Sequence, residues 1–193
     1  MQIAEEYFEG LKKAYAERCG DKWTEFMSVA HGASDKDISL LQEKFPDTPE
    51  SLIWLLKHVD GTYHREYAGR KRCLYFLGSK LKEYPYYLLS AEQMARHAGI
   101  PAGIDEIIDG EFGDRDKRLI NDSRKGKWLH FSDCMNNGGT SQLFIDFSPS
   151  DSGKYGQIVM YVHDPDEVSV IANSFDEYLK MLIDYGFDFI MED

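Results

Sequence analysis

The segment from Trp128 to Asp184 decides the fold, and it reads WLHFSDCMNNGGTSQLFIDFSPSDSGKYGQIVMYVHDPDEVSVIANSFDEYLKMLID. Apolar, β-prone runs alternate in it with polar turns rich in Asn, Gly, Pro and Asp. The runs predict strands at 128–131, 142–147, 157–163 and 168–172. Because consecutive strands on short connections pair antiparallel, we expect an antiparallel meander.

A capped helix closes this segment. Ser174 and Glu177 form an S-x-x-E capping box, and apolar residues continue at helical spacing as far as Ile183. Upstream of the meander, the same spacing and capping signals predict helices over 3–18, 34–45, 48–60 and 90–97, and one helical turn at 104–108. In the third of these, Thr48 is the expected N-cap and Pro49 the first helical residue.

The remaining segments carry weaker signals. Residues 23–32 are expected to be a connector, 64–72 a basic loop, and 99–127 a long excursion with scattered glycines. The runs 73–77 and 84–89 are strand-like. Helices, a meander and a final helix together predict an α+β fold, with a mostly antiparallel sheet and helices packed against one face.

Length and composition predict one compact unit. At 193 residues, 42% of them hydrophobic, the chain has enough apolar surface for one sizeable core. We divide it into an N-terminal helix with its connector (1–33) and a main domain (34–193) that forms one unit with that helix.

The charge balance is strongly acidic, with 34 acidic and 22 basic residues and a net charge of −12. Nine acidic residues lie between Met160 and Asp193, against Lys180 alone. Such a surface repels phosphate backbones, so we expect no nucleic-acid partner. It attracts basic proteins and accelerates their encounter with the chain, although an acidic surface also serves solubility alone.

Membrane, export and metal signals are missing from the sequence. No apolar run approaches the roughly 18 residues that span a bilayer. Glu5 and Glu6 stand where a secretory signal carries positive charge, so we expect a cytoplasmic protein without a membrane partner. Cys19, Cys73 and Cys134 are widely spaced, which disfavours a disulfide framework or a zinc cage. We expect no metal and no cofactor.

The amino-acid sequences of several segments are similar to those of one known family. They are W-L-x-F at 128–131, L-F-I-D-F-S-P at 143–149, G-Q-I-V at 156–159 and A-N-S-F-D-E-Y-L at 172–179. In this order they resemble the Smi/Knr cell-wall-assembly regulator family of the SUKH superfamily. The resemblance covers roughly residues 35–184 and departs from the family pattern between Thr62 and Lys127.

The resemblance implies one SUKH-like α+β domain without catalytic apparatus. Many bacterial members are immunity proteins that bind and neutralise polymorphic toxins, often nucleases, whereas fungal members are scaffolding regulators of wall synthesis. A cognate toxin domain is therefore the expected partner, and a regulatory scaffold is the alternative. The family-motif residues expected to be structural are Trp128, Asp146, Gly156, Gln157, Ser174 and Phe175.

Two polar turns of the meander are the predicted partner-binding surface, because turn residues face solvent. They span 133–139 and 164–167. Whether they share one end of the sheet depends on the strand order, which stays open. The candidate residues are Asp133, Asn136, Asn137, Asp164, Asp166 and Glu167.

A small metal-dependent hydrolase is a third reading, built from His130, Asp146 and His163 on neighbouring predicted strands. It has no H-E-x-x-H motif and no G-x-S-x-G motif to support it. Asp146 is flanked by Ile145 and Phe147, so it needs a partner if it is buried. We favour a structural role in which its carboxylate holds the N–H groups of a neighbouring turn.

Overall fold

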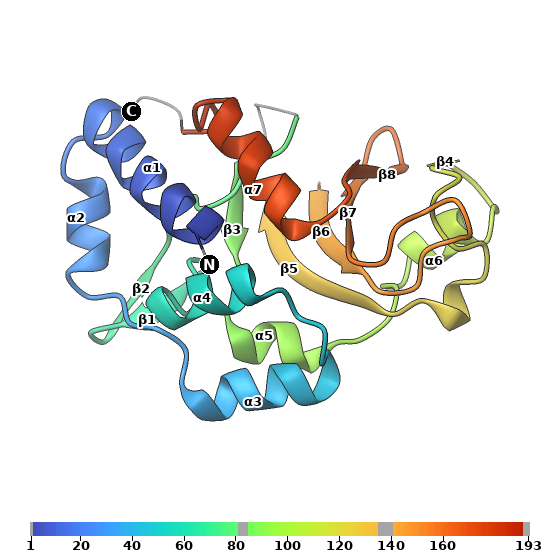
Figure 1. The fold of residues 1–193 in the computed structure, drawn as a ribbon, viewed down its shortest axis with the longest axis horizontal. Coiled ribbons are helices and arrows are strands. Elements are labelled where there is room, and N and C mark those ends of the chain that lie inside the picture. The colour runs from blue at the N-terminus through green and yellow to red at the C-terminus, as the bar shows by residue number, and fades with distance from the viewer. Residues whose placement is uncertain (1, 81–84, 135–140, 191–193) are drawn as a thin grey trace.

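The computed structural model describes residues 2–80, 85–134 and 141–190, and its centre is one six-stranded sheet (Figure 1). The strand order is β3-β5-β6-β7-β8-β4. Their bounds are β3 (Tyr86–Leu88), β4 (Asp114–Arg115), β5 (Trp128–Cys134), β6 (Ser141–Asp146), β7 (Gln157–Val162) and β8 (Glu167–Ala172). Only the β4–β8 pair is parallel, so the predicted α+β fold with a mostly antiparallel sheet is confirmed.

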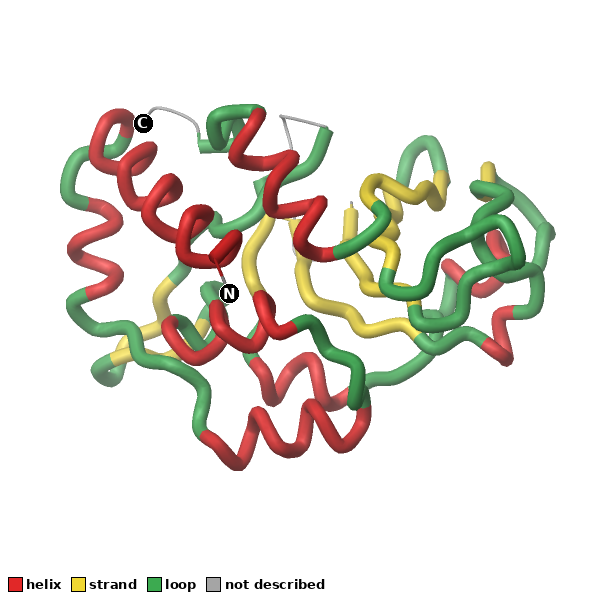
Figure 2. The backbone as a smooth tube through the Cα atoms, in the orientation of Figure 1, coloured by secondary structure: helices red, strands yellow, loops and turns green. Residues whose placement is uncertain are grey.

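Most of the helices lie on one side of this sheet, and α6 (Ile104–Ile108) lies on the other side (Figure 2). Their bounds are α1 (Gln2–Arg18), α2 (Lys22–Met27), α3 (Asp35–Lys44), α4 (Glu50–His58), α5 (Ala91–Arg96), α6 (Ile104–Ile108) and α7 (Phe175–Asp184), with a 3₁₀ turn at Ser123–Lys125. The predicted caps at Ser34, Ser90 and Ser174 form, and each side chain accepts a hydrogen bond from the backbone N–H three residues later.

Several predictions in the first half of the chain are wrong. The supposed connector at 23–32 contains helix α2, and the supposed basic loop at 64–72 is a hairpin of β1 (Arg65–Tyr67) and β2 (Arg70–Arg72). The N-cap of α4 is Pro49, not Thr48, because the Thr48 hydroxyl donates to the carbonyl of Phe45 instead. Both α2 and the hairpin are short elements that depend on buried side chains such as Trp23 and Tyr67.

The meander follows the prediction with one important difference. β5 continues past Phe131 to Cys134 through a bulge between His130 and Ser132. Asp133 is therefore a strand residue opposite Gln142, and not a turn residue as predicted. An extra residue at a bulge lets the strand bend and resume pairing, which no run of apolar residues announces.

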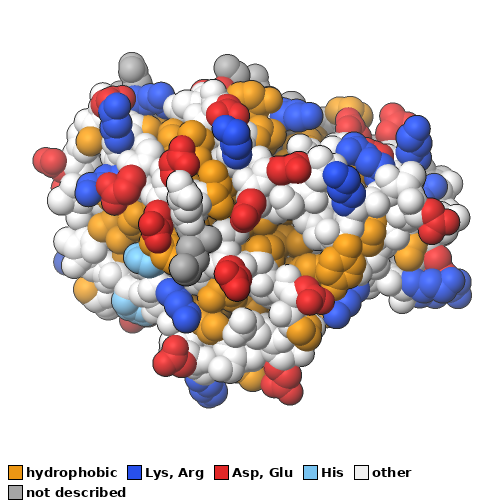
Figure 3. Space-filling model, viewed as in Figure 1, with side chains coloured by type: hydrophobic (Ala, Val, Ile, Leu, Met, Phe, Trp, Pro, Cys, Tyr) orange, Lys and Arg blue, Asp and Glu red, His pale blue; other side chains and the backbone are white. Residues whose placement is uncertain are grey.

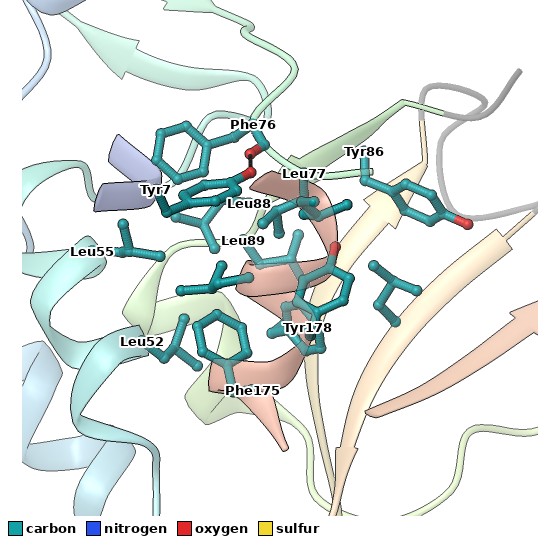
Figure 4. Close-up of a cluster of buried hydrophobic side chains, with 14 of the residues drawn as sticks. Tyr7, Leu52, Leu55, Phe76, Leu77, Tyr86, Leu88, Leu89, Phe175 and Tyr178 are labelled. Atoms are coloured by element: carbon teal, nitrogen blue, oxygen red, sulfur yellow. Dashed lines mark hydrogen bonds between the residues drawn. The ribbon is translucent and has the colours of Figure 1, made fainter. Parts of the chain in front are cut away.

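The inner face of the sheet carries the main core, where α7 lies against β7 and β8 and α1 and α4 pack beside α7 (Figure 1). Buried tyrosines connect this core to the irregular segment before β3. Tyr7 donates to the carbonyl of Phe76 (Figure 4). Tyr178 donates to the carbonyl of Gly78 at 2.6 Å. Burial raises the pKa of both phenols, which keeps them neutral donors. These bonds fix an apolar but non-repetitive segment against the helices.

The outer face of the sheet is covered as well, which was not expected. Ile104, Ile107 and Ile108 of α6 and Leu119 pack on Trp128, Phe144, Val159, Val168 and Val170. Asp116 and Arg118 hold this cover to β8, since the Arg118 guanidinium bonds both the Asp116 carboxylate and the carbonyl of Val170. The bond from Arg118 lowers the pKa of Asp116 to about 2. The 99–127 excursion is thus an ordered second layer.

Among the residues described, no helix has the length and apolar character needed to cross a membrane.

Candidate functional site

The strand register shows at which end of the sheet each predicted binding turn lies. Asp133 pairs with Gln142, Gln142 with Tyr161, and Tyr161 with Val168. The end of β5 and the β7–β8 turn therefore lie at the same end, about 14 Å apart across three strand spacings. Asn136 and Asn137, the other residues predicted for the 133–139 turn, lie outside the described residues.

The β7–β8 turn presents its acidic residues outward from a fixed backbone. Asp164 has φ +67°, precedes a cis peptide bond to Pro165, and is exposed, as is Glu167. The backbone carbonyl of Asp166 accepts the N–H of Asp114, where β4 pairs with β8. This pairing anchors the turn to the second layer.

Asp166 is the one acidic side chain of this turn with side-chain partners of its own. Its Oδ1 lies 2.8 Å from His163 Nδ1 and accepts the Tyr161 hydroxyl at 3.1 Å. The hydrogen bond between His163 and Asp166 raises the pKa of the imidazole and lowers that of the carboxyl. Asp166 is therefore a half-buried carboxylate, whereas Asp164 and Glu167 are exposed.

Asp114 joins this group, although no sequence pattern predicted its place here. It lies directly opposite Glu167 in the β4–β8 pair and is exposed. We name the surface of Asp114, Asp164, Asp166 and Glu167 the acidic corner. His163 bonds Asp166, and the Arg115 guanidinium donates to the carbonyls of Leu119 and Ile120. Lys80 and Arg118 line a hollow together with Glu167, and Arg118 is paired with Asp116. The corner keeps a negative balance.

Asp133 does not belong to the acidic corner, despite lying at the same end of the sheet. Its Oδ1 is 3.0 Å from His130 Nε2 and accepts the Gln142 amide at 3.0 Å, and its side chain is 15% exposed. The three side chains line a hollow of about 480 Å³ between β5, β6 and the end of α5, with Trp128 and Arg96 also on its wall. The structure therefore divides the predicted binding residues into two groups.

The opposite end of the sheet holds Asp146, which is fully buried. Its Oδ1 accepts the backbone N–H of Ser148 at 2.7 Å, and its Oδ2 accepts the Gln157 amide at 2.9 Å. Burial raises the pKa of Asp146, and the bonds from Gln157 and Ser148 oppose that rise. The backbone N–H of Gly156, at the other end of this connection, donates to the backbone carbonyl of Asp146. This carboxylate joins the two ends of the β6–β7 connection.

Other family-motif residues have packing or capping positions. Trp128 is directly opposite Asp146 on the outer face, in contact with Phe144. Ser174 caps α7, and Phe175 packs its ring edge-on against Phe131 in the inner core.

The residues proposed for a hydrolase do not come together. His130 bonds Asp133, Asp146 bonds Ser148 and Gln157, and His163 bonds Asp166. His163 follows the end of β7, while Asp146 pairs with Gln157 at its start, roughly 20 Å away at the rise of a β-strand. Within the described ranges, no group of three or more His, Cys, Asp or Glu side chains has the arrangement of a metal site. The predicted His130–Asp146–His163 set is therefore wrong.

Comparison with known proteins places the chain in a family. No curated protein matches it. The family model of the SMI1/KNR4 family (SUKH-1) matches residues 32–181, which include α3 to α5, the outer layer, the whole meander and most of α7. On that match, the chain belongs to the SMI1/KNR4 family (SUKH-1).

Proposed function

We propose that this chain is a non-enzymatic immunity protein that binds and neutralises a cognate polymorphic toxin, with a basic nuclease as the partner that its charge fits best. The family supports a protein-interaction module in general, and its members are generally non-catalytic binding proteins. The toxin and the immunity role are the narrower part of the proposal.

The acidic corner is the observation that carries the proposal. Its exposed carboxylates, Asp164 and Glu167, stand on a turn whose backbone is fixed by pairing with β4. A rigid, charged and exposed surface needs little ordering when it binds, so more of the interaction energy appears as affinity. Turns held by a rigid sheet are common sites of recognition.

Electrostatics favour a basic partner. The net charge of −12 gives the chain a long-range field that attracts positive surfaces. Encounter between complementary charged patches is accelerated most at low ionic strength, since the Debye length falls from about 30 Å at 0.01 M to about 8 Å at 0.15 M salt. The association rate with a basic toxin should therefore fall steeply as salt is added.

Co-expression with the toxin gene adjacent to this one tests the proposal. We expect the chain to restore growth of cells that produce the toxin, and to co-purify with it at fixed stoichiometry. Recovery of several unrelated proteins without growth rescue would point to the regulatory scaffold instead. Neither rescue nor binding would overturn the immunity role.

A further inference from the structure

A second hollow lies at the end of the sheet opposite the acidic corner, on the inner-face side. It has a volume of about 470 Å³ and is enclosed by the starts of α4 and α7 and by the β6–β7 connection. In Figure 3, which views this side, hydrophobic side chains gather near the middle of the face with acidic and basic side chains around them. We name the hollow the aromatic pocket, after Phe147, Tyr155 and Phe175 in its lining.

The aromatic lining is held in place by neighbouring contacts. The Tyr155 ring lies 5.2 Å from that of Phe147, and its hydroxyl donates to Asp47 Oδ2 at 2.6 Å. The bond to Asp47 raises the pKa of Tyr155 to about 12, so the ring stays neutral with an electron-rich face. Tyr155 nevertheless is 56% exposed. A large aromatic ring fixed in position and open to solvent is a ready contact surface for a partner.

The charged residues of the pocket all have one sign. Asp47, Glu50 and Asp176 line it, and no Lys, Arg or His does so among the residues described. Asp176 accepts the buried Ser51 hydroxyl through one oxygen only. Glu50 is exposed, and no hydrogen bond or ion pair joins it to another part of the described chain. The carboxylates in the pocket lining therefore retain unused acceptor capacity.

The N-termini of α4 and α7, which border this pocket, do not make it an anion site. Glu50 and Asp176 lie in the first turns of α4 and α7, where a negative side chain offsets the positive end of the helix dipole. An arriving anion would meet these carboxylates first. A cation meets both the carboxylates and the ring face of Tyr155.

We propose that the aromatic pocket receives an arginine side chain from a basic segment of a protein partner. A guanidinium is planar, stacks on an aromatic face and donates in a fork that matches a carboxylate, so it suits Tyr155 and Glu50 together better than the compact ammonium of lysine does. The pocket is a contact site apart from the acidic corner. The inference does not depend on the partner being a toxin.

An NMR titration tests this site without any identified partner. The probe is the blocked peptide acetyl-Gly-Arg-Gly-amide, and its neutral control replaces arginine by citrulline, which has nearly the same shape. We expect saturable shift changes of the Ser51, Gly156 and Phe175 amides with the arginine peptide, weaker ones with a lysine peptide, and none with citrulline.

Matched variants assign the binding to the pocket. Tyr155→Ala should weaken arginine binding about fivefold, whereas Tyr155→Phe keeps the ring and should retain it. Glu50→Gln with Asp176→Asn should weaken it about fivefold to tenfold, and Glu25→Gln, an exposed acid on α2, should have no effect.

Two results would overturn the inference. One is the absence of local, saturable shifts at the pocket, including the case in which the shifts appear only at the acidic corner. The other is equal binding of the arginine and citrulline peptides. Either result leaves the proposed immunity function standing, because that function is tested by growth rescue and not by these peptides.

Discussion

The two ends of the six-stranded sheet carry the same kind of side chain in opposite environments. At one end, Asp146 is fully buried, and its two oxygens accept hydrogen bonds from Ser148 in the β6–β7 connection and from Gln157 at the start of β7. At the other end, Asp164 and Glu167 are exposed, and no other described residue bonds their carboxylates. The difference lies in what surrounds each carboxylate.

This difference separates stability from recognition. A buried carboxylate stabilises the fold only while its partners remain, because removing it leaves buried donors without acceptors. An exposed carboxylate contributes little to stability and much to the field that a partner meets. We therefore expect substitutions at the Asp146 end to affect folding, and substitutions at the acidic corner to affect binding.

The largest effect on stability is expected from Asp146→Ala. The substitution leaves the Ser148 N–H and the Gln157 amide without their acceptor inside the protein. We expect a loss of about 3 kcal/mol in the free energy of unfolding. Urea denaturation measures it, with Asp164→Ala as the exposed control. Equal denaturation midpoints for the two variants would contradict the division between the two ends.

A smaller effect is expected from Asp146→Asn, with a defined dependence on pH. The amide oxygen still accepts from Ser148, so we expect a loss of about 1 kcal/mol at low pH. Burial raises the pKa of Asp146 in the folded state, so that state binds the proton more tightly than the unfolded chain does, where the pKa is about 3.9. The stabilisation that the Asp146 carboxyl contributes is fully present below its pKa in the unfolded chain. It is lost as pH rises through its pKa in the folded protein.

The corresponding measurement is urea denaturation of both proteins at a series of pH values. The free-energy advantage of the wild type over Asp146→Asn should shrink as pH rises from about 3.9 through the raised pKa, and then stay constant. An advantage that grows over this range would show that the hydrogen bonds outweigh burial in setting the pKa of Asp146.

At the acidic corner, Asp166→Asn should change the pKa of His163 and leave the free energy of unfolding nearly unchanged. The bond to Asp166 raises the pKa of His163 above its usual value, about 6.5. Any stabilisation from this pair is present below about pH 6.5 and is lost as pH rises through the raised pKa. We expect the substitution to lower the pKa of His163 toward 6.5, as followed by NMR of the imidazole. An unchanged pKa would mean that the pair does not form in solution.

Much of the fold was predictable from the sequence, because it depends on local patterns. The strands of the meander have apolar runs and turn residues, and α5 and α7 have capping serines at Ser90 and Ser174. The elements that were missed, α2, the β1–β2 hairpin and β4, are all short. Their formation depends on contacts distant in sequence, such as the pairing of Asp114 with Glu167.

The candidate site was predictable only in part, for the same reason. The β7–β8 turn follows from Asp164 and Pro165, but the placement of Asp114 beside it depends on a parallel pair with no sequence signal. Asp133 was placed in a turn because the bulge that extends β5 leaves no mark on the apolar pattern. Strand order, which places both segments at one end, is likewise set by tertiary packing.

The most direct test of the account is the association rate of the Asp164→Lys/Asp166→Lys variant with the toxin, measured by stopped flow at low and high salt. Glu9→Lys/Glu17→Lys is the matched control, since it changes the net charge equally at exposed positions of α1. We expect the corner variant to bind about tenfold more slowly than this control at low salt, with the difference closing at high salt and the melting temperature unchanged. Equal association rates for the two variants would contradict a docking role for the acidic corner.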